Sequence, residues 1–501
     1  MNKKIIGLIG GCVLIAGLAA AVVVVSRQQA AEEESSIAAS ESLAAETSQD
    51  PAALILSEQD PNSVVSVAVT NSTGSYDIIR TAEADAETAA NAVFGVKGWE
   101  DVPTNTSLAW TLANNMASLT ATAVVAEDCT EMEKYGLEDG AAEAVMTFDD
   151  GSTFAFRVGS PVSDGENNYF AVEGEDTVYS VKTSLTANFS KAAEDFLSLT
   201  LLEAPAQDAY PIVNSLTISR EDMEEDIVLT YAEDANSENT GGTAASHEMT
   251  SPIAAYLSVE RSTDVITGIF GVKADHILKI YPEESDFAEY GLDTPFGTAV
   301  MDCDDGNVYT LKIGDRYSET DAETGVSAAY YPVYLEGVDV IYAMAEADCL
   351  WATVTPTDLA SSLVLATYVW DIEELNITAK GKEAMEFDIT GEDKETAVVK
   401  RNGEICDTER YRLFYTFLLQ TTAESVTLDA EPVGEPEITL YFRTHDGSKE
   451  QELCFYRQDA FTCLITVNGE SAFSCRASYI DTFLENIDLF DTDEDFIKTW
   501  S

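Results

Sequence analysis

Basic residues are scarce in this chain. Its 501 residues include 27 lysines and arginines against 90 aspartates and glutamates, which gives a formal net charge of −63. A surface with this excess of acid repels nucleic acid and anionic lipid headgroups, so the composition argues against a polyanionic partner. The same acidity keeps a protein soluble through self-repulsion, and any attraction for cations would be unspecific.

Motifs that carry chemistry are scarce as well. The sequence has no HExxH, GxSxG, Walker A or GxGxxG pattern, and only three histidines occur, His247, His276 and His445. These histidines fall in different predicted elements without partners at fixed spacing, which predicts solvated surface side chains. We therefore expect no catalytic residue, no cofactor and no metal site, and a protein that is not an enzyme.

Two acidic clusters resemble calcium loops at first sight. DCDDGN (302–307) does not place its glycine and final ligand where an EF-hand needs them, so a hairpin turn is the better interpretation. DLFDTDEDF (488–496) lacks the same glycine and final ligand. It predicts a solvated tail, with adventitious calcium binding as the open alternative.

Eight cysteines are present, and Cys12 lies in an apolar N-terminal run. The other seven form no CxxC pair and no zinc spacing, and several alternate with polar residues in strand-like segments. This pattern favours small buried hydrophobic side chains. A disulfide within the group Cys454, Cys463 and Cys475 stays an open alternative if the domain is exported.

The longest hydrophobic run stands at the N-terminus. Lys3 and Lys4 precede 21 uncharged residues, 5–25, which would span about 31 Å as a helix. A cleaved signal peptide and a lipoprotein attached at Cys12 are the rival interpretations, but only an uncleaved anchor explains the whole run. We predict a transmembrane helix over 1–25 with a cytoplasmic N-terminus. The Ala/Glu/Ser-rich residues 26–60 then form a flexible stalk.

A segment in the middle of the chain is written twice with a constant spacing of 155 residues. EKYGLEDGAAEAVMTFDDGSTFAFRVG begins at residue 133 and EYGLDTPFGTAVMDCDDGNVYTLKIGD at residue 289, so the equivalent residues Tyr135 and Tyr290 are 155 positions apart. In each copy Tyr-Gly-Leu leads into two alternating runs that flank Asp-Gly, which predicts a β-hairpin with a type I′ turn. The recurring residues are Tyr135, Gly136, Leu137, Asp150, Gly151 and Gly159, and Tyr290, Gly291, Leu292, Asp305, Gly306 and Gly314.

A third copy follows with the same order of elements but without Tyr-Gly-Leu. FLLQTTAESVTLDA (417–430) resembles the segments before the first two hairpins, and THDGSK (444–449) supplies the turn. Each copy begins with its own strand pair and ends with another. We therefore predict an α+β fold: the transmembrane helix followed by three related units of mostly antiparallel sheet with one or two helices each. Their predicted bounds are 61–205, 206–365 and 366–501.

Aromatic residues in the predicted strands allow two interpretations. They could form a carbohydrate-binding platform, or they could pack the sheets against neighbouring strands. Alternation along a strand gives burial a ready explanation, so packing is favoured. The residues are Tyr169, Phe170, Tyr179, Tyr330, Tyr331, Tyr334 and Tyr342.

The chain resembles the DUF4340 family of bacterial envelope proteins. The resemblance rests on the anchor, the YGLE and YGLD segments, the DDG hairpin that ends in Val-Gly or Ile-Gly, the NYF and AYY strands and the closing VY and IY. It is clearest over 110–181 and 265–344. Because members often accompany ABC-transporter genes and a GldG-like exported partner, the resemblance implies an accessory role beside a membrane transporter. It carries over no catalytic residue.

Together these features predict a single-pass protein of the cell membrane, with most of the chain extracytoplasmic. We expect an accessory or scaffold subunit whose partner is an ABC-transporter permease or a GldG-like protein, with no nucleic acid bound. The alternative is a surface module that binds glycan or peptide through exposed tyrosines.

Overall fold

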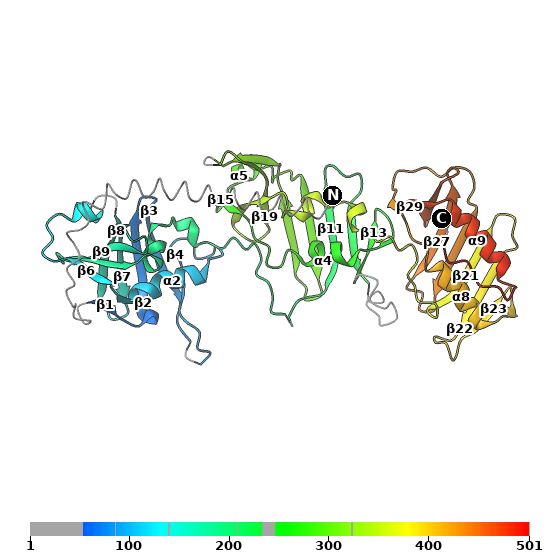
Figure 1. The fold of residues 1–501 in the computed structure, drawn as a ribbon, viewed down its shortest axis with the longest axis horizontal. Helices are drawn as coiled ribbons and strands as arrows, with labels where there is room; N and C mark the ends of the chain where they lie inside the picture. The colour runs from blue at the N-terminus through cyan, green and yellow to red at the C-terminus, as the bar shows by residue number, and fades with distance from the viewer. Residues whose placement is uncertain are drawn as a thin grey trace, which may run out of the picture. The chain divides into compact units, whose positions relative to one another are not determined.

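The computed structural model describes residues 54–85, 87–138, 141–207, 209–232, 246–321 and 324–499 (Figure 1). These residues form mostly antiparallel strands with few helices, which confirms the predicted sheet-rich α+β character. Across these ranges, no helix has the length and apolarity needed to cross a membrane. The predicted anchor and most of the predicted stalk lie outside the described residues.

The end of the predicted stalk is structured, which corrects the sequence interpretation there. Strand β1 (Ile55–Glu58) pairs with β5 (Ser118–Thr120), and a 3-10 turn, η2 (Pro61–Ser63), follows it. Asp60 caps that turn by accepting a hydrogen bond from the backbone N–H of Asn62. The segment 54–60 does not stand out as a strand in the sequence, because its apolar run contains only Leu54, Ile55 and Leu56.

The first large sheet has eight strands in the order β4-β3-β2-β7-β8-β9-β10-β6. Its strands are β2 (Val64–Asn71), β3 (Gly74–Ala82), β4 (Val93–Val96), β6 (Ala123–Ala126), β7 (Ala142–Phe148), β8 (Thr153–Pro161), β9 (Asn167–Val172) and β10 (Val178–Lys182). 

The second sheet has the order β14-β13-β12-β11-β16-β17-β19-β20-β15, with β18 paired to β19. Its strands are β11 (Val213–Arg220), β12 (Ile227–Tyr231), β13 (His247–Ser251), β14 (Ala255–Tyr256), β15 (His276–Ile280), β16 (Gly297–Cys303), β17 (Val308–Ile313), β18 (Tyr317–Thr320), β19 (Ser327–Leu335) and β20 (Val340–Ala345).

The third sheet has the order β24-β23-β22-β21-β26-β27-β28-β29-β25. Its strands are β21 (Ile372–Ala379), β22 (Met385–Thr390), β23 (Val398–Arg401), β24 (Glu404–Ile405), β25 (Ser425–Val426), β26 (Ile438–Thr444), β27 (Glu450–Arg457), β28 (Thr462–Val467) and β29 (Glu470–Arg476).

The three sheets share one plan. In each, the hairpin that contains Asp-Gly is central, the opening strand pair lies on one side of it and the closing pair on the other. The strand that follows the helix, β6, β15 or β25, is reached earlier in the chain but pairs with the closing strand. Strands such as β16 and β26 alternate buried and half-buried residues, because successive side chains of a strand point to opposite faces.

Helices cover these sheets sparingly. The longer ones are α2 (Thr106–Ala117), α4 (Val259–Thr267), α8 (Thr408–Leu418) and α9 (Ser478–Leu489). Short turns of helix are α3 (Thr183–Thr186), α5 (Glu284–Glu289), α6 (Leu350–Thr353), α7 (Pro356–Leu359), η3 (Met132–Tyr135), η4 (Ala187–Ser190) and η5 (Ala193–Phe196). 

Helices α8 and α9 lie beside the third sheet (Figure 1). They contact each other through Phe414 and Phe483, whose ring centroids are 6.3 Å apart. The tail after α9 is not simply solvated, because Phe490 and Phe496 are buried against Phe414 while the acidic residues 491–495 are exposed. Asn486 also exchanges two hydrogen bonds with the backbone of Ile497. Buried aromatic rings, together with the ion pair of Asp491 with Arg401 at 2.9 Å, therefore hold this tail.

By internal contacts the chain divides into two compact units. Among the described residues, one unit contains those of 54–75 and 111–191, and the other contains those of 76–110 and 192–499. The second and third sheets thus fall within the same unit.

Candidate functional site

In the first sheet the backbone of the Tyr-Gly-Leu segment, 135–137, lies directly against Gly159, and we call this contact the clasp. Helix η3 ends at Gly136, whose φ of 65° lies in the left-handed region that favours glycine. The next residue, Leu137, is almost fully buried and packs with Val178. A side chain at Gly159, just past the hairpin, would collide with the carbonyl oxygen of Tyr135. The recurring glycines therefore let the two chain segments touch.

The second sheet repeats this clasp. Helix α5 leads to Tyr290, Gly291 follows with a φ of 67°, and Leu292 is almost fully buried. A Cβ at Gly314 would again collide with a carbonyl oxygen, that of Tyr290. A Cβ at Gly291 would come within 2.7 Å of Asp315 Oδ2.

The Asp-Gly pairs turn the central hairpins, but not as type I′ turns. Gly151 and Gly306 have φ of 81° and 86°, whereas Asp150 and Asp305 are not among the residues with positive φ. The N–H of Gly151 donates to the carbonyl of Phe148, as in a type I turn, and the glycine then forms the bulge of a three-residue loop. Both halves of an Asp-Gly pair suit either turn, so sequence alone could not separate the two.

The aspartates of these turns serve their own loops. Asp150 Oδ1 accepts the backbone N–H of Ser152 at 2.8 Å, and Asp305 Oδ1 accepts that of Asn307 at 2.9 Å. The bonds from Ser152 lower the pKa of the Asp150 carboxyl. No group of three or more potential metal ligands gathers anywhere in the described ranges.

The third sheet uses a different device at the same place. Three residues occupy equivalent positions in the second strands of the three central hairpins: Val158, Ile313 and Phe455. Each pairs with the first residue of its hairpin's first strand, which is Ala142 of β7, Gly297 of β16 or Ile438 of β26. The residue after Val158 and after Ile313 is the clasp glycine, but the residue after Phe455 is Tyr456. The residue after that is Ser160, Asp315 or Arg457. Arg457 therefore stands where the other sheets meet their Tyr-Gly-Leu segments.

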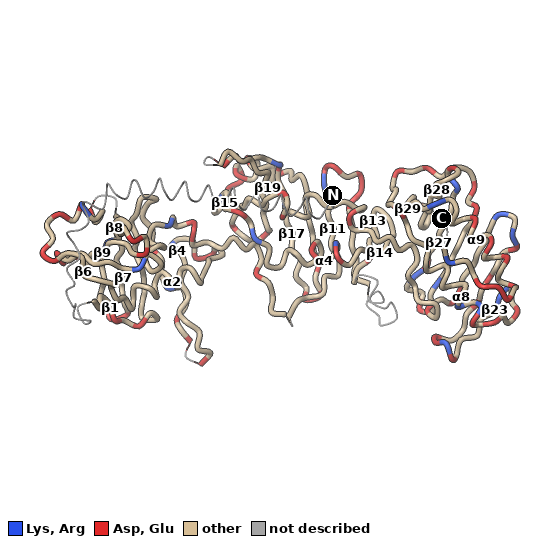
Figure 2. The backbone as a smooth tube through the Cα atoms, viewed as in Figure 1, with Lys and Arg blue, Asp and Glu red and all other residues tan. Residues whose placement is uncertain are grey.

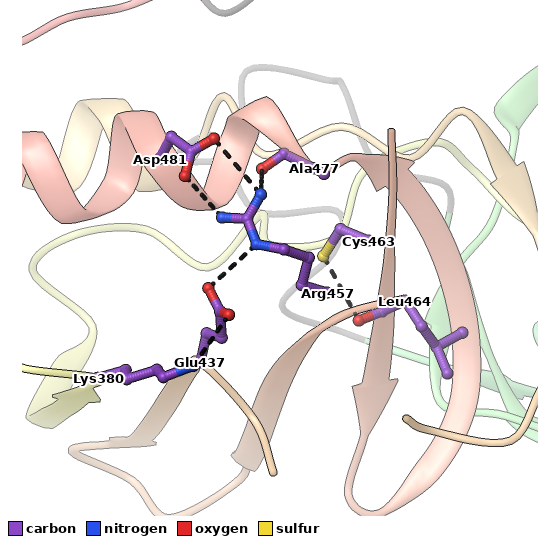
Figure 3. A network of polar contacts seen from close by, with 7 residues as sticks. All are labelled: Lys380, Glu437, Arg457, Cys463, Leu464, Ala477 and Asp481. Atoms are coloured by element: carbon purple, nitrogen blue, oxygen red, sulfur yellow. Dashed lines mark hydrogen bonds and ion pairs between the residues drawn. The ribbon is translucent and has the colours of Figure 1, made fainter. Parts of the chain in front are cut away.

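Arg457 is the centre of a polar network that Figure 3 shows. Its Nε lies 3.2 Å from Glu437 Oε2, and a terminal nitrogen donates to Asp481 Oδ1 at 2.6 Å. A further bond reaches the carbonyl of Ala477, at the start of α9. Lys380 completes the network by pairing with Glu437 at 3.3 Å. The hydrogen bonds to Asp481, the largest influence, raise the pKa of Arg457, so the guanidinium remains charged.

Two thiols lie in the same row of the sheet as Arg457. Arg457 is directly opposite Cys463 on β28, and Cys463 is directly opposite Cys475 on β29. Residues directly opposite each other project from the same face of a sheet. All seven cysteines of the described residues are free, five of them are buried, and Cys463 is fully so. The sequence singled out this cysteine group, but it could not supply the register.

The described residues of the compact unit that contains the second and third sheets line cavities. One of about 370 Å³ is lined by Thr422, Glu424, Cys475, Arg476, Lys498 and Thr499. Another, of about 130 Å³, is lined in part by Glu248, Tyr256 and Lys449. The Lys449 ammonium in this cavity pairs with Glu248 Oε1 at 2.8 Å. It also donates a hydrogen bond to the Tyr256 hydroxyl at 2.9 Å.

The three histidines differ in burial, and the prediction of solvated side chains is wrong for His247. His247 is buried, with Nε2 2.7 Å from the carbonyl oxygen of Val213 and Nδ1 2.9 Å from Ser246 Oγ. Burial lowers its pKa, so the ring is neutral at pH 7. His276 and His445 are half-buried, and His276 lies 3.3 Å from Glu319. The prediction failed at His247 because a neutral imidazole can sit in a core once both nitrogens are hydrogen-bonded.

The aromatic residues of the closing strands pack rather than protrude. Phe170 and Tyr342 are fully buried, Tyr179 and Tyr331 are nearly so, and Tyr169, Tyr330 and Tyr334 are half-buried. None is exposed. Acidic residues, by contrast, line the loops of all three sheets (Figure 2).

The described residues thus form three antiparallel sheets of similar strand order, two of which carry the clasp. The model of the family "Domain of unknown function (DUF4340)" matches residues 99–280, which confirms the resemblance read from the sequence. The matched range contains the whole first clasp. No curated protein and no solved structure matches the chain.

Proposed function

We propose that the protein is a non-enzymatic, membrane-anchored accessory or scaffold subunit that works outside the cytoplasm beside an ABC-type transporter. The apolar run 5–25 supports the anchor, and the family resemblance supports the transporter setting. The N-terminus would be cytoplasmic and the three sheet units extracytoplasmic. The proposed partner is the transporter permease or a GldG-like exported protein.

One observation carries the proposal: the recurring residues build the fold. Tyr135 and Tyr290 offer backbone carbonyls, Gly159 and Gly314 provide clearance, and the turn aspartates cap their own loops. Residues used in this way favour a stable series of surfaces for protein contact. Exposed apolar side chains offer contact points on those surfaces, notably Phe461, which is 84% exposed in the loop between β27 and β28.

The alternative function, glycan or peptide binding through exposed tyrosines, gains no support from these observations. The tyrosines named for it in the closing strands are buried or half-buried, and the exposed tyrosines Tyr210 and Tyr281 lie outside those strands. 

Photocrosslinking in native membranes tests the proposed partnership. A photoreactive residue is placed at Phe461 in the tagged full chain, and a matched chain carries it at the buried Phe483. We expect permease or GldG-like peptides to be enriched with the exposed probe and not with the buried one. Equal recovery of these peptides from both chains, or none above an untagged control, would contradict the proposal.

A further inference from the structure

The row Arg457–Cys463–Cys475 contains two thiols in a geometry that suits a covalent bond. The carbonyls of Ala472 and Ser474 accept hydrogen bonds from the β25 side, so the backbone groups of Cys475 face β28. Cys463 and Cys475 therefore form a hydrogen-bonded pair of an antiparallel ladder, with Cα atoms about 5.5 Å apart. This separation lies inside the range of about 4.4 to 6.8 Å that disulfides adopt.

The two thiols differ in access. Cys463 is fully buried, whereas Cys475 lines the cavity of about 370 Å³ together with Arg476 and Lys498. The side-chain contact with Cys475, followed by burial, raises the pKa of the Cys463 thiol, so Cys463 stays protonated at rest. A reagent that enters the cavity would therefore meet Cys475 before Cys463.

We propose that Cys463 and Cys475 form a reversible disulfide across β28 and β29, with Cys475 as the entry thiol. The oxidant is a disulfide, either a small molecule or a thiol oxidoreductase. Cys475 loses its proton and attacks one sulfur of the oxidant, which releases the first thiolate. Cys463 then loses its proton and attacks Cys475 Sγ, which releases the second. The two protein thiols give up two protons and two electrons, and the oxidant is reduced to two thiols.

The position of the two cysteines favours a reversible regulatory disulfide over a permanent structural one. Side chains of opposed residues start with Cβ atoms about 4.5 to 5.5 Å apart, whereas a disulfide holds them near 3.8 Å. The strands must therefore approach each other, and a strained bond is reduced more readily than a relaxed one. Arg457 lies beside the pair and holds Asp481 of α9. Oxidation would thus stiffen the corner where α9 leaves β29.

Thiol counting on the full chain tests the proposal. The folded protein is incubated with oxidised glutathione, denatured and alkylated with a maleimide, and its mass and its non-reduced peptides are measured. We expect two of the eight cysteines to escape alkylation and the Cys463 peptide to be joined to the Cys475 peptide. Dithiothreitol added to the folded protein should restore both sites.

Cys454 provides the matched control, because it is buried on β27 but faces Thr466 on the next strand. The variant Cys454→Ala should still lose two alkylation sites, whereas Cys463→Ala and Cys475→Ala should lose none to an internal bond. If a variant fails to fold, the peptide map of the unaltered chain still decides. Three outcomes would overturn the proposal. Cys463 and Cys475 could both remain free after oxidation, glutathione could remain attached to Cys475, or the Cys463–Cys475 disulfide could form only in urea. The test needs no transporter, so its outcome is independent of the proposed function.

Discussion

The second and third sheets pair their strands in the same order, yet they secure the central hairpin by different chemistry. In the second sheet the backbone of Tyr290 lies against Gly314, and in the third Tyr456 and Arg457 occupy the corresponding positions. One solution depends on the lack of a side chain and the other on a charged side chain. The comparison shows that the repeated units keep the same strand order, although different contacts hold the central hairpin to the rest of each unit.

The largest effect is expected from Gly314→Ala. Its added methyl group would overlap the Tyr290 carbonyl oxygen, and neither the strand nor the clasp can move without losing packing. We expect a loss of about 3 kcal/mol in the free energy of unfolding, near the upper end for overpacking. Peptide-resolved hydrogen exchange should show faster exchange in β16 and β17 and little change in β26 and β27. Equal protection in both hairpins would show that the clasp is dispensable.

Arg457→Ala tests the other fastening. It removes the hydrogen bonds to Glu437 and Asp481, and we expect a loss of about 1 to 2 kcal/mol, since Arg457 is only 26% exposed but Asp481 is 67% exposed. Exchange should quicken at the start of α9 and in β27. Arg457→Lys keeps the charge without the guanidinium fork, so it should restore only part of the protection. If Arg457→Ala kept full protection from hydrogen exchange in α9 and β27, the Arg457 network would not be what stabilises this part of the third sheet.

Gly306→Ala separates backbone strain from collision. Gly306 has a φ of 86°, but a Cβ there would meet no atom within 4 Å. We expect a loss of about 1 kcal/mol, the cost of a left-handed alanine, measured by urea unfolding beside Gly314→Ala. Gly306→Asn should cost less, because asparagine tolerates this conformation better. An equal loss of unfolding free energy in Gly306→Ala and Gly314→Ala would contradict the idea that collision makes Gly314→Ala the more damaging change.

The smallest effect concerns His247, which lies in the second sheet. Its pKa is lowered in the folded protein, so the unfolded chain binds more protons below the ordinary histidine pKa of about 6.5. The stability contributed by the neutral ring is present above that pH and is lost as the pH falls toward the folded pKa. The protection factors of the amides in β11 and β13, which correct for the intrinsic slowing of exchange at lower pH, should therefore fall between pH 7.5 and pH 5.5. The variant His247→Gln should remove this pH dependence, and an unchanged dependence would assign it to other groups.

Sequence patterns were sufficient for the strands and the central hairpins. Alternation, Asp-Gly and the 155-residue spacing depend on local geometry, which neighbouring residues encode. The presence of Tyr456 and Arg457 where the second sheet has Gly314 and Asp315 could not be predicted, because it requires the register of β26 with β27 and the position of α9. The same limit applies to the Cys463–Cys475 pair and to His247, whose partners lie far away in sequence or on another strand.

The placement of β6, β15 and β25 has a consequence for how the chain acquires its structure. Each of these strands is made before the central hairpin, but each pairs only with the last strand of its sheet. A chain that emerges from its N-terminus must therefore hold this strand unpaired until the sheet's final residues arrive. Every sheet closes late and through distant contacts, which slows folding and exposes an open edge in the interim. Chaperone demand during synthesis or export should accordingly rise three times along the chain, once for each sheet.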